Sequence, residues 1–148
     1  MKKITGLYIG ILIIINTAYL GLELYKNTVR DRWAADEGIV EEAYHQLQQL
    51  MGITGFLEVL LVLVILVGAL GIVFCKKKEL LKTQVIITLG ISVLFLAGAF
   101  VAGLVFDAPR GNLYQQIHSM NGAIALILTY RFITGFLRKR EMAGTPGN

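Results

Sequence analysis

Apolar positions gather in four long stretches, and short groups of polar and charged residues separate them. The stretches cover residues 4–24, 53–74, 85–106 and 117–137. Each is close to the roughly 20 apolar residues of helix that cross the hydrocarbon core of a bilayer. Helices are expected because the bilayer interior holds no water to bond unpaired backbone groups. The pattern predicts an all-α integral membrane protein, built as a bundle of four transmembrane helices.

The polar flanks extend some of these helices. Residues 36–49 contain no proline, one glycine and many helix formers, so the second helix is expected from near Ile39, with Asp36 as its N-cap. Proline and glycine within 107–112 predict a tight turn. The predicted organisation is a single domain over 1–148, with helices at about 4–24, 39–75, 83–106 and 113–138 and an outer segment at 25–52.

Composition supports a membrane bundle. The chain has 148 residues, 55% of them hydrophobic, and a mean hydropathy of +0.66, which is more apolar than soluble domains of this size. Met1 to Gly21 resembles a signal peptide, but it lacks a clear small-x-small cleavage site, so we expect it to remain as a membrane helix. The single cysteine, Cys75, predicts no disulfide.

Basic residues are distributed unevenly between the two sides of the predicted bundle. Short cytoplasmic loops hold an excess of lysine and arginine, which predicts that both termini are cytoplasmic in the cell (inner) membrane. The net charge of +4 then reflects topology and anionic lipid head groups, and nucleic acid is not expected as a partner. Nine basic residues lie on the predicted cytoplasmic side: Lys2, Lys3, Lys76, Lys77, Lys78, Lys82, Arg138, Lys139 and Arg140.

The chain has two histidines, His45 and His118, at the outer ends of the second and fourth predicted helices. Both helices run inward, and small residues follow on roughly the same faces: Gly52 in one, Gly122 and Ala125 in the other. Two imidazoles across such a gap are able to ligate a haem iron axially. The spacing alone leaves two other interpretations open, namely histidines without a cofactor, and a zinc or copper site with weak additional ligands in Glu42, Met51 and Met120.

The depth of the two histidines presents a geometric problem. His45 precedes Lys76 by 31 residues, whereas His118 precedes Arg138 by 20. If the two histidines lie at the same depth, the inner ends of their helices differ in depth by about 16 Å. Projecting helices, a kink near Gly52, or histidines that share no ligand would each resolve it.

Two ionisable residues lie within the apolar stretches, Glu58 and Arg131. Each lies thirteen positions after the histidine of its own helix. If the two histidines lie at the same depth in the membrane, Glu58 and Arg131 therefore also lie at the same depth. An intramembrane ion pair between Glu58 and Arg131 is then expected.

Three short motifs resemble the heme A synthase family. Glu42-Ala-Tyr-His45 resembles the Glu-x-x-His motif of its second helix, and the Gly-Ala-Phe-Val-Ala-Gly run at 98–103 resembles one in its third. Ile117-His118, followed by small residues, resembles its fourth. The chain departs from the family at Gln46, where arginine is usual, and it lacks the loop cysteine pair of some members.

The resemblance implies one four-helix half of a family whose full-length members have two. It implies His45 and His118 as ligands of a haem of b, o or a type, and Glu42 as the catalytic acid that helps to oxidise a methyl of haem O to the formyl of haem A. A lone half is expected to form a homo-oligomer or to join another membrane subunit of a respiratory complex. The alternatives are a b-type cytochrome subunit that passes electrons to or from quinone, and a structural subunit without a cofactor.

Overall fold

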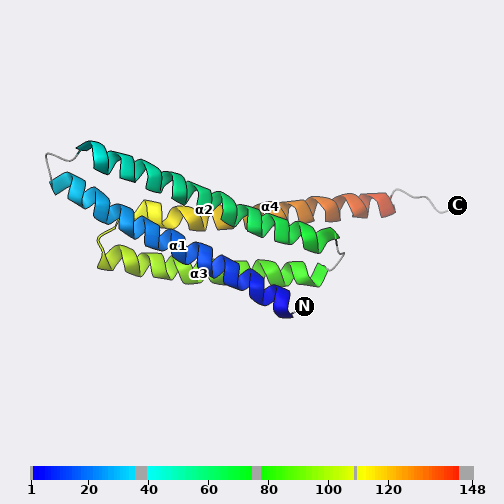
Figure 1. The fold of residues 1–148 in the computed structure, drawn as a ribbon. Coiled ribbons are helices and arrows are strands. Elements are labelled where there is room, and N and C mark those ends of the chain that lie inside the picture. Colours follow the sequence, from blue (N-terminus) through cyan, green and yellow to red (C-terminus); the bar gives the residue numbers. More distant parts are fainter. Residues whose placement is uncertain (1, 36–39, 75–77, 109, 144–148) are drawn as a thin grey trace.

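The chain folds into one bundle of long helices. The computed structural model describes residues 2–35, 40–74, 78–108 and 110–143. Within them lie four helices, α1 (Lys2–Ala35), α2 (Val40–Phe74), α3 (Lys78–Val105) and α4 (Arg110–Ala143). Each runs antiparallel to the one before it (Figure 1). All four contain a stretch long and apolar enough to span a membrane, so the predicted all-α, four-helix architecture is confirmed for these ranges.

The helices are longer than the apolar stretches that predicted them. α1 continues to Ala35, well beyond the expected end at residue 24, and α4 begins at Arg110 rather than 113. Most of the predicted outer segment is therefore helix, because residues 25–35 contain neither glycine nor proline to interrupt α1. The expected start of α2 near Ile39 agrees with Val40. Asp36 and Cys75 lie outside the described residues.

The two ends of the bundle differ. At the hairpin end α1 leads into α2 and α3 leads into α4, whereas the terminal end holds the start of α1, the end of α4 and the connection from α2 to α3. Figure 1 shows α4 shifted along the bundle toward the terminal end, so that it starts short of α2 and its last turns extend past the other helices. This shift decides which residues of α2 and α4 become neighbours.

The predicted tight turn between α3 and α4 is present. The Phe106 N–H donates to the carbonyl of Ala102 at 2.9 Å, one residue past the end of α3. Asp107 then adopts a left-handed backbone conformation with φ of 47°. Aspartate is one of the few residues besides glycine that adopt this conformation readily, and its position here lets the chain reverse direction.

Apolar side chains fill the middle of the bundle and also cover its surface. A contiguous core is built from all four helices: Leu12, Ile15, Leu61, Ile65, Ala69, Leu81, Ile91, Met120, Ala123 and Ile127. The exposed surface includes many large apolar side chains, among them Phe56, Val67, Ile86, Val93, Leu126 and Phe132. Apolar cover of this extent is unusual for a soluble protein and suits a lipid surround.

Several polar side chains point inward. The buried set is Asn16, Glu23, Asn27, Thr54, Gln84, Thr88, Ser92 and Gln116. In a membrane bundle, polar side chains are expected inside and apolar side chains outside, because lipid offers no hydrogen bonds. Several of these polar groups belong to two clusters, one in each half of the bundle, whereas Ser92 donates separately to Asn121 of α4 at 3.3 Å.

The cluster near the terminal end centres on Gln84 of α3. Its amide nitrogen donates to the carbonyl of Ile65 at 3.0 Å and to the Tyr8 hydroxyl at 3.3 Å. The Tyr8 hydroxyl lies 2.8 Å from the Thr88 hydroxyl. Gly68 of α2 leaves the space for this amide, since a Cβ there would come within 2.8 Å of the Gln84 nitrogen. The cluster therefore joins α1, α2 and α3.

Replacing Gly68 should destabilise the bundle, whereas the same change three residues later should not. Gly68→Ala displaces the buried Gln84 amide from its acceptors, and an unsatisfied buried group costs about 1–3 kcal/mol. Gly71→Ala meets nothing within 4 Å and gains helix propensity of up to about 1 kcal/mol. Thermal unfolding of the purified protein, followed by circular dichroism, should show a lower midpoint only for Gly68→Ala. Equal midpoints would contradict the proposed role of Gly68.

Candidate functional site

The cluster near the hairpin end contains the ionisable residues of the bundle interior. Tyr19, Glu23, Lys26, Asn27 and Arg30 follow one another along α1 at spacings of three or four residues, apart from the adjacent pair at 26 and 27. This spacing puts them on one side of the helix. Tyr19, Glu23 and Asn27 are buried, so that side of α1 is directed into the bundle.

Glu23 and Lys26 form a buried ion pair. Lys26 Nζ lies 2.6 Å from Glu23 Oε1, and the two side chains are only 12% and 4% exposed. The ammonium group also lies 3.4 Å from the hydroxyl of Thr54 on α2, which itself donates to the carbonyl of Met51. Removing one member of such a pair would leave an uncompensated charge in the bundle. The pair thus attaches α1 to α2.

Side chains of two other helices form hydrogen bonds with Glu58 of α2. Its Oε1 lies 3.0 Å from the Tyr19 hydroxyl, and its Oε2 accepts a hydrogen bond from Gln115 Nε2 at 3.3 Å. The same Tyr19 hydroxyl lies 3.1 Å from the carbonyl oxygen of Asn112. Tyr19, which is 1% exposed, therefore links α1 to both α2 and α4.

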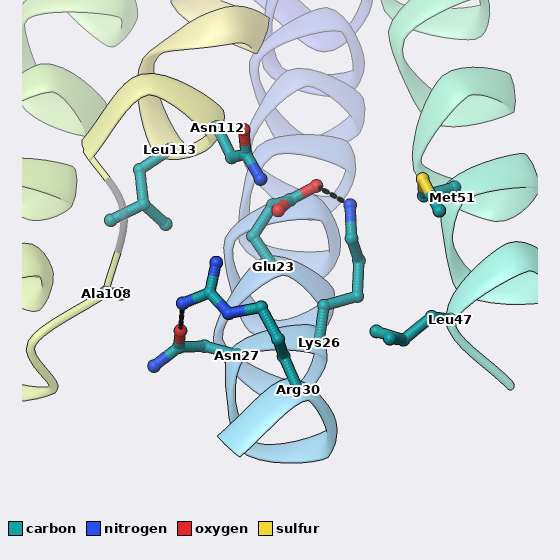
Figure 2. A pocket seen from close by; sticks show the side chains of 9 residues that line it. All are labelled: Glu23, Lys26, Asn27, Arg30, Leu47, Met51, Ala108, Asn112 and Leu113. Atoms are coloured by element: carbon teal, nitrogen blue, oxygen red, sulfur yellow. Dashed lines mark hydrogen bonds and ion pairs between the residues drawn. The ribbon is translucent and has the colours of Figure 1, made fainter. Parts of the chain in front are cut away.

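A small cavity lies beside these groups at the hairpin end. Its volume is about 170 Å³, and Figure 2 shows the side chains around it. The Arg30 guanidinium donates to Asn27 Oδ1, and the Asn27 amide donates onward to Asp31 at 3.3 Å and to the Phe106 carbonyl at 3.4 Å. We call it the Glu23 cavity and define it by its lining residues: Glu23, Lys26, Asn27, Arg30, Leu47, Met51, Ala108, Asn112 and Leu113.

The contact between Gln115 and Glu58 sets the register of α4 against α2. With these two side by side, His118 lies at about the level of Leu61. His45 precedes Glu58 by thirteen residues, or about 20 Å along the helix. α4 begins at Arg110, so it does not reach the level of His45 at all.

The structure therefore does not bring His45 and His118 together. Their separation along the bundle is about 24 Å at 1.5 Å per residue. The ligating nitrogen atoms of two imidazoles on opposite sides of one metal ion lie roughly 4 Å apart, because each metal–nitrogen bond is about 2 Å long. Of the three solutions to the depth mismatch, the observed fold adopts the one in which these histidines share no ligand within a chain. Haem binding itself stays a prediction.

The other predicted site residues lie on the surface of the bundle. His45 and His118 are both exposed, and the His45 ring packs against Tyr44 in an edge-to-face arrangement, at a centroid distance of 6.0 Å. A cofactor between facing helices would instead need its small residues directed into the bundle. The remaining predicted positions are exposed as well: Glu42, Gly52, Gly122 and Ala125.

The expected ion pair between Glu58 and Arg131 is wrong. The register that places Gln115 beside Glu58 also places Arg131 at the level of Phe74, the last residue of α2. Glu58 and Arg131 are therefore about 24 Å apart along the bundle. Arg131 lies in the half of α4 nearer the terminal end.

The additional ligands considered for zinc or copper are also dispersed. Met120 is in the apolar core, Met51 lines the Glu23 cavity and Glu42 is exposed on α2. Among the residues that the structure describes, no group of three or more histidine, cysteine, aspartate or glutamate side chains is placed to hold a metal ion.

Reasoning from the sequence missed Glu23, Lys26 and Asn27. They were assigned to the end of the first apolar stretch and to an outer segment, because hydropathy falls there. The signal that could have found them is the helical spacing from Tyr19 to Arg30, which predicts a polar side on a continued helix.

Comparison with known proteins adds no family: no family model, curated protein or solved structure matches the chain. The similarity to heme A synthase rests on its three short motifs alone. The class that the fold defines is a small helical bundle with four candidate membrane spans, consistent with a multi-pass membrane protein.

Proposed function

We propose that this protein binds a small ligand in the Glu23 cavity through a carboxylate or phosphate group on that ligand. The observation that carries the proposal is the Arg30 guanidinium, whose one hydrogen-bond partner among the described residues is the side-chain oxygen of Asn27. A guanidinium has five N–H donors in a fixed geometry that suits carboxylate and phosphate oxygens. Arg30 thus has donors to spare at the cavity.

The charges around the cavity favour an anion over a cation. Glu23 and Lys26 neutralise each other at 2.6 Å, which leaves the charge of Arg30 in excess on the lining. Asn112 of α4 adds a side-chain amide to the lining (Figure 2). A ligand that offers acceptor oxygens complements this set of donors better than one that offers donors.

The size and walls of the cavity restrict the ligand further. A volume of about 170 Å³ is smaller than the roughly 300–1,000 Å³ of sites that enclose a whole drug-sized molecule. Leu47 and Met51 from α2 and Leu113 from α4 supply apolar contact. The cavity therefore suits a short organic acid, or the head group of an amphipathic molecule whose remaining part stays in lipid.

Loss of the Arg30 charge should weaken this binding. Arg30→Gln should lower the affinity for butyrate or inorganic phosphate about 10- to 100-fold, since hydrogen bonds to charged groups contribute about 1.5–3 kcal/mol. Calorimetric titration of the protein in nanodiscs of neutral lipid measures the affinity for butyrate and for phosphate. Native mass spectrometry after reconstitution with phosphatidylglycerol tests whether a lipid phosphate supplies the same group.

The matched control is Arg32→Gln, which removes an exposed arginine two residues away that does not line the cavity. Binding should survive this change. A wild-type protein that binds none of the three probes, or equal losses in both variants, would contradict the proposal.

The charge distribution favours an orientation in which the Glu23 cavity opens on the outer side of the cell membrane. Lys2 and Lys3, Lys78 and Lys82 all belong to turns of α1 and α3 at the terminal end. Arg138, Lys139 and Arg140 lie in the part of α4 that extends past the other helices at that end (Figure 1). The positive-inside rule then supports cytoplasmic termini.

Cysteine labelling should report this orientation. A membrane-impermeant maleimide applied to intact cells should leave the native Cys75 unlabelled until the cells are permeabilised. It should label Glu41→Cys in a Cys75→Ser background at once, because Glu41 is exposed at the hairpin end of α2. The reverse labelling pattern would place the cavity on the cytoplasmic side.

A second candidate function is haem binding between two copies of the chain. The observation that favours it is the exposed face of α4, where His118 is followed by exposed Gly122 and Ala125, and Gly122 has open space around it. A two-fold dimer would present the same histidine from each copy. Glu42 would then be about 28 Å away along the bundle, which favours the b-type cytochrome alternative over heme A synthase chemistry.

A reduced-minus-oxidised spectrum of the purified protein tests this candidate. Bis-histidine haem should give sharp α and β bands that His118→Ala abolishes and His45→Ala leaves intact. The absence of bands after supplementation with haem would exclude a haem protein. Loss of the bands in both variants would exclude the dimer geometry, since His45 lies outside it.

A further inference from the structure

A second cavity lies near the terminal end, between α1, α2 and α3. Its volume is about 410 Å³, which is more than twice that of the Glu23 cavity. Ile4 and Val67 line it and are exposed, so the cavity borders the apolar outer surface of the bundle. We call it the Gln84 cavity and define it by two lining residues from each helix: Ile4, Tyr8, Val67, Gly71, Gln84 and Ile87.

The walls of the Gln84 cavity are mainly apolar. Most of its lining residues are aliphatic or glycine, and none of those that the structure describes is charged. A charged ligand group would find no counter-ion on such a lining, and burying it there would be costly. Binding sites for small molecules commonly combine apolar walls with a few polar groups that fix the orientation of the ligand. The lining therefore suits a neutral, largely apolar molecule.

The side-chain amide of Gln84 offers this cavity an unused acceptor. Its nitrogen donates to the carbonyl of Ile65 at 3.0 Å and to the Tyr8 hydroxyl at 3.3 Å. A carbonyl oxygen can only accept, so the amide atom that faces Ile65 is the nitrogen. The other end of the amide, Gln84 Oε1, is buried and makes no hydrogen bond to the described residues. A buried oxygen in this state gains from any donor that reaches it.

The two hydroxyl groups of the cluster do not supply that donor. The Thr88 hydroxyl donates to the backbone carbonyl of Gln84 at 2.8 Å, and the Tyr8 hydroxyl lies 2.8 Å from the Thr88 oxygen. Each hydroxyl hydrogen thus has an acceptor within the cluster. A donor for Gln84 Oε1 has to come from another molecule.

We propose that the Gln84 cavity binds a neutral amphipathic molecule that carries a free hydroxyl group on an apolar chain. The hydroxyl donates to Gln84 Oε1, and the chain lies against the aliphatic walls toward the outer surface of the bundle. Gln84 is 5% exposed and this oxygen is covered, so binding involves a small shift of the lining side chains. Gly71 has open space around it and leaves room for the chain.

This site differs from the Glu23 cavity in place and in chemistry. The two cavities lie in opposite halves of the bundle and share no lining residue. The Glu23 cavity has donors in excess and suits an anion, whereas the Gln84 cavity has an acceptor in excess and suits a neutral donor. Binding at one site therefore does not depend on binding at the other.

Photolabelling of the full chain in nanodiscs tests the proposal. The probe is a dodecanol analogue with a diazirine on its chain, and peptide mapping by mass spectrometry locates the label. Label is expected on residues that line the Gln84 cavity. At equal mole fraction in the bilayer, 1-dodecanol should displace the probe about 3- to 10-fold more effectively than dodecyl methyl ether, which has no hydrogen to donate.

Two glycine variants of α2 test the location of the site. Gly71→Leu should abolish labelling of the cavity, because the new side chain enters the open space beside Gly71. Gly55→Leu is the matched control, since Gly55 is also exposed with open space around it but does not line the Gln84 cavity. Labelling should be unchanged in the control. Label that survives Gly71→Leu, or that is lost equally in both variants, would overturn the proposal.

A third variant tests the role of the Gln84 oxygen. Gln84→Met removes the acceptor and keeps a side chain of similar length, so the alcohol and the ether should displace the probe equally well. If this variant does not fold, the comparison of alcohol with ether in the wild-type protein decides. Equal displacement there would show that the cavity takes any apolar chain, including those of the surrounding lipid, and would contradict a site for a hydroxyl group.

Discussion

A carboxyl group inside an apolar helical bundle must find hydrogen-bond partners within the protein, and the hairpin half is arranged around this constraint. Glu58 obtains them from Tyr19 of α1 and Gln115 of α4, and Glu23 obtains one from Lys26. The exposed surface of the bundle is largely apolar, so these contacts have no competition from lipid. They therefore hold α1, α2 and α4 in one relative position, while apolar packing, which is less directional, fills the space between them.

The relative position of α1, α2 and α4 determines which side chains can act together in the bundle. A register that levelled His45 with His118 would slide α4 toward the hairpin end and take Gln115 away from Glu58. It would leave the half-buried Glu58 carboxyl group without this hydrogen bond, whose net contribution is about 0.5–1.5 kcal/mol. The histidines gain nothing comparable without a bound metal. The polar network therefore fixes the register of α4, and the histidine pair of the family resemblance is separated as a result.

The fold was largely predictable from the sequence, and the register was not. The number of helices followed from four apolar stretches, because length and hydropathy directly reflect the thickness of a bilayer. The end of α1 was misplaced by the largest margin, since hydropathy measures preference for lipid and α1 continues beyond its apolar stretch as a polar helix to Ala35. The expected pairing of Glu58 with Arg131 was wrong because it assumed that His45 and His118 lie at the same depth. Equal spacing from the two histidines places Glu58 beside Arg131 only under that assumption. Relative depth depends on contacts between helices, such as Gln115 with Glu58, that a single helix does not encode.

The apolar core lies between the two polar clusters. Leu12, Leu61, Ile65 and Met120 are fully buried between the level of Glu58 and the Gln84 cluster. On the terminal side, Gln84 and Thr88 are neutral, and Tyr8 bonds to both of them. Two buried polar residues lie in the same part of the bundle as the core, Asn16 of α1 and Ser92 of α3, and the Ser92 hydroxyl donates to Asn121 of α4 at 3.3 Å. Hydrogen bonds between helices are therefore distributed along the bundle, and each adds a directional constraint to the apolar packing around it.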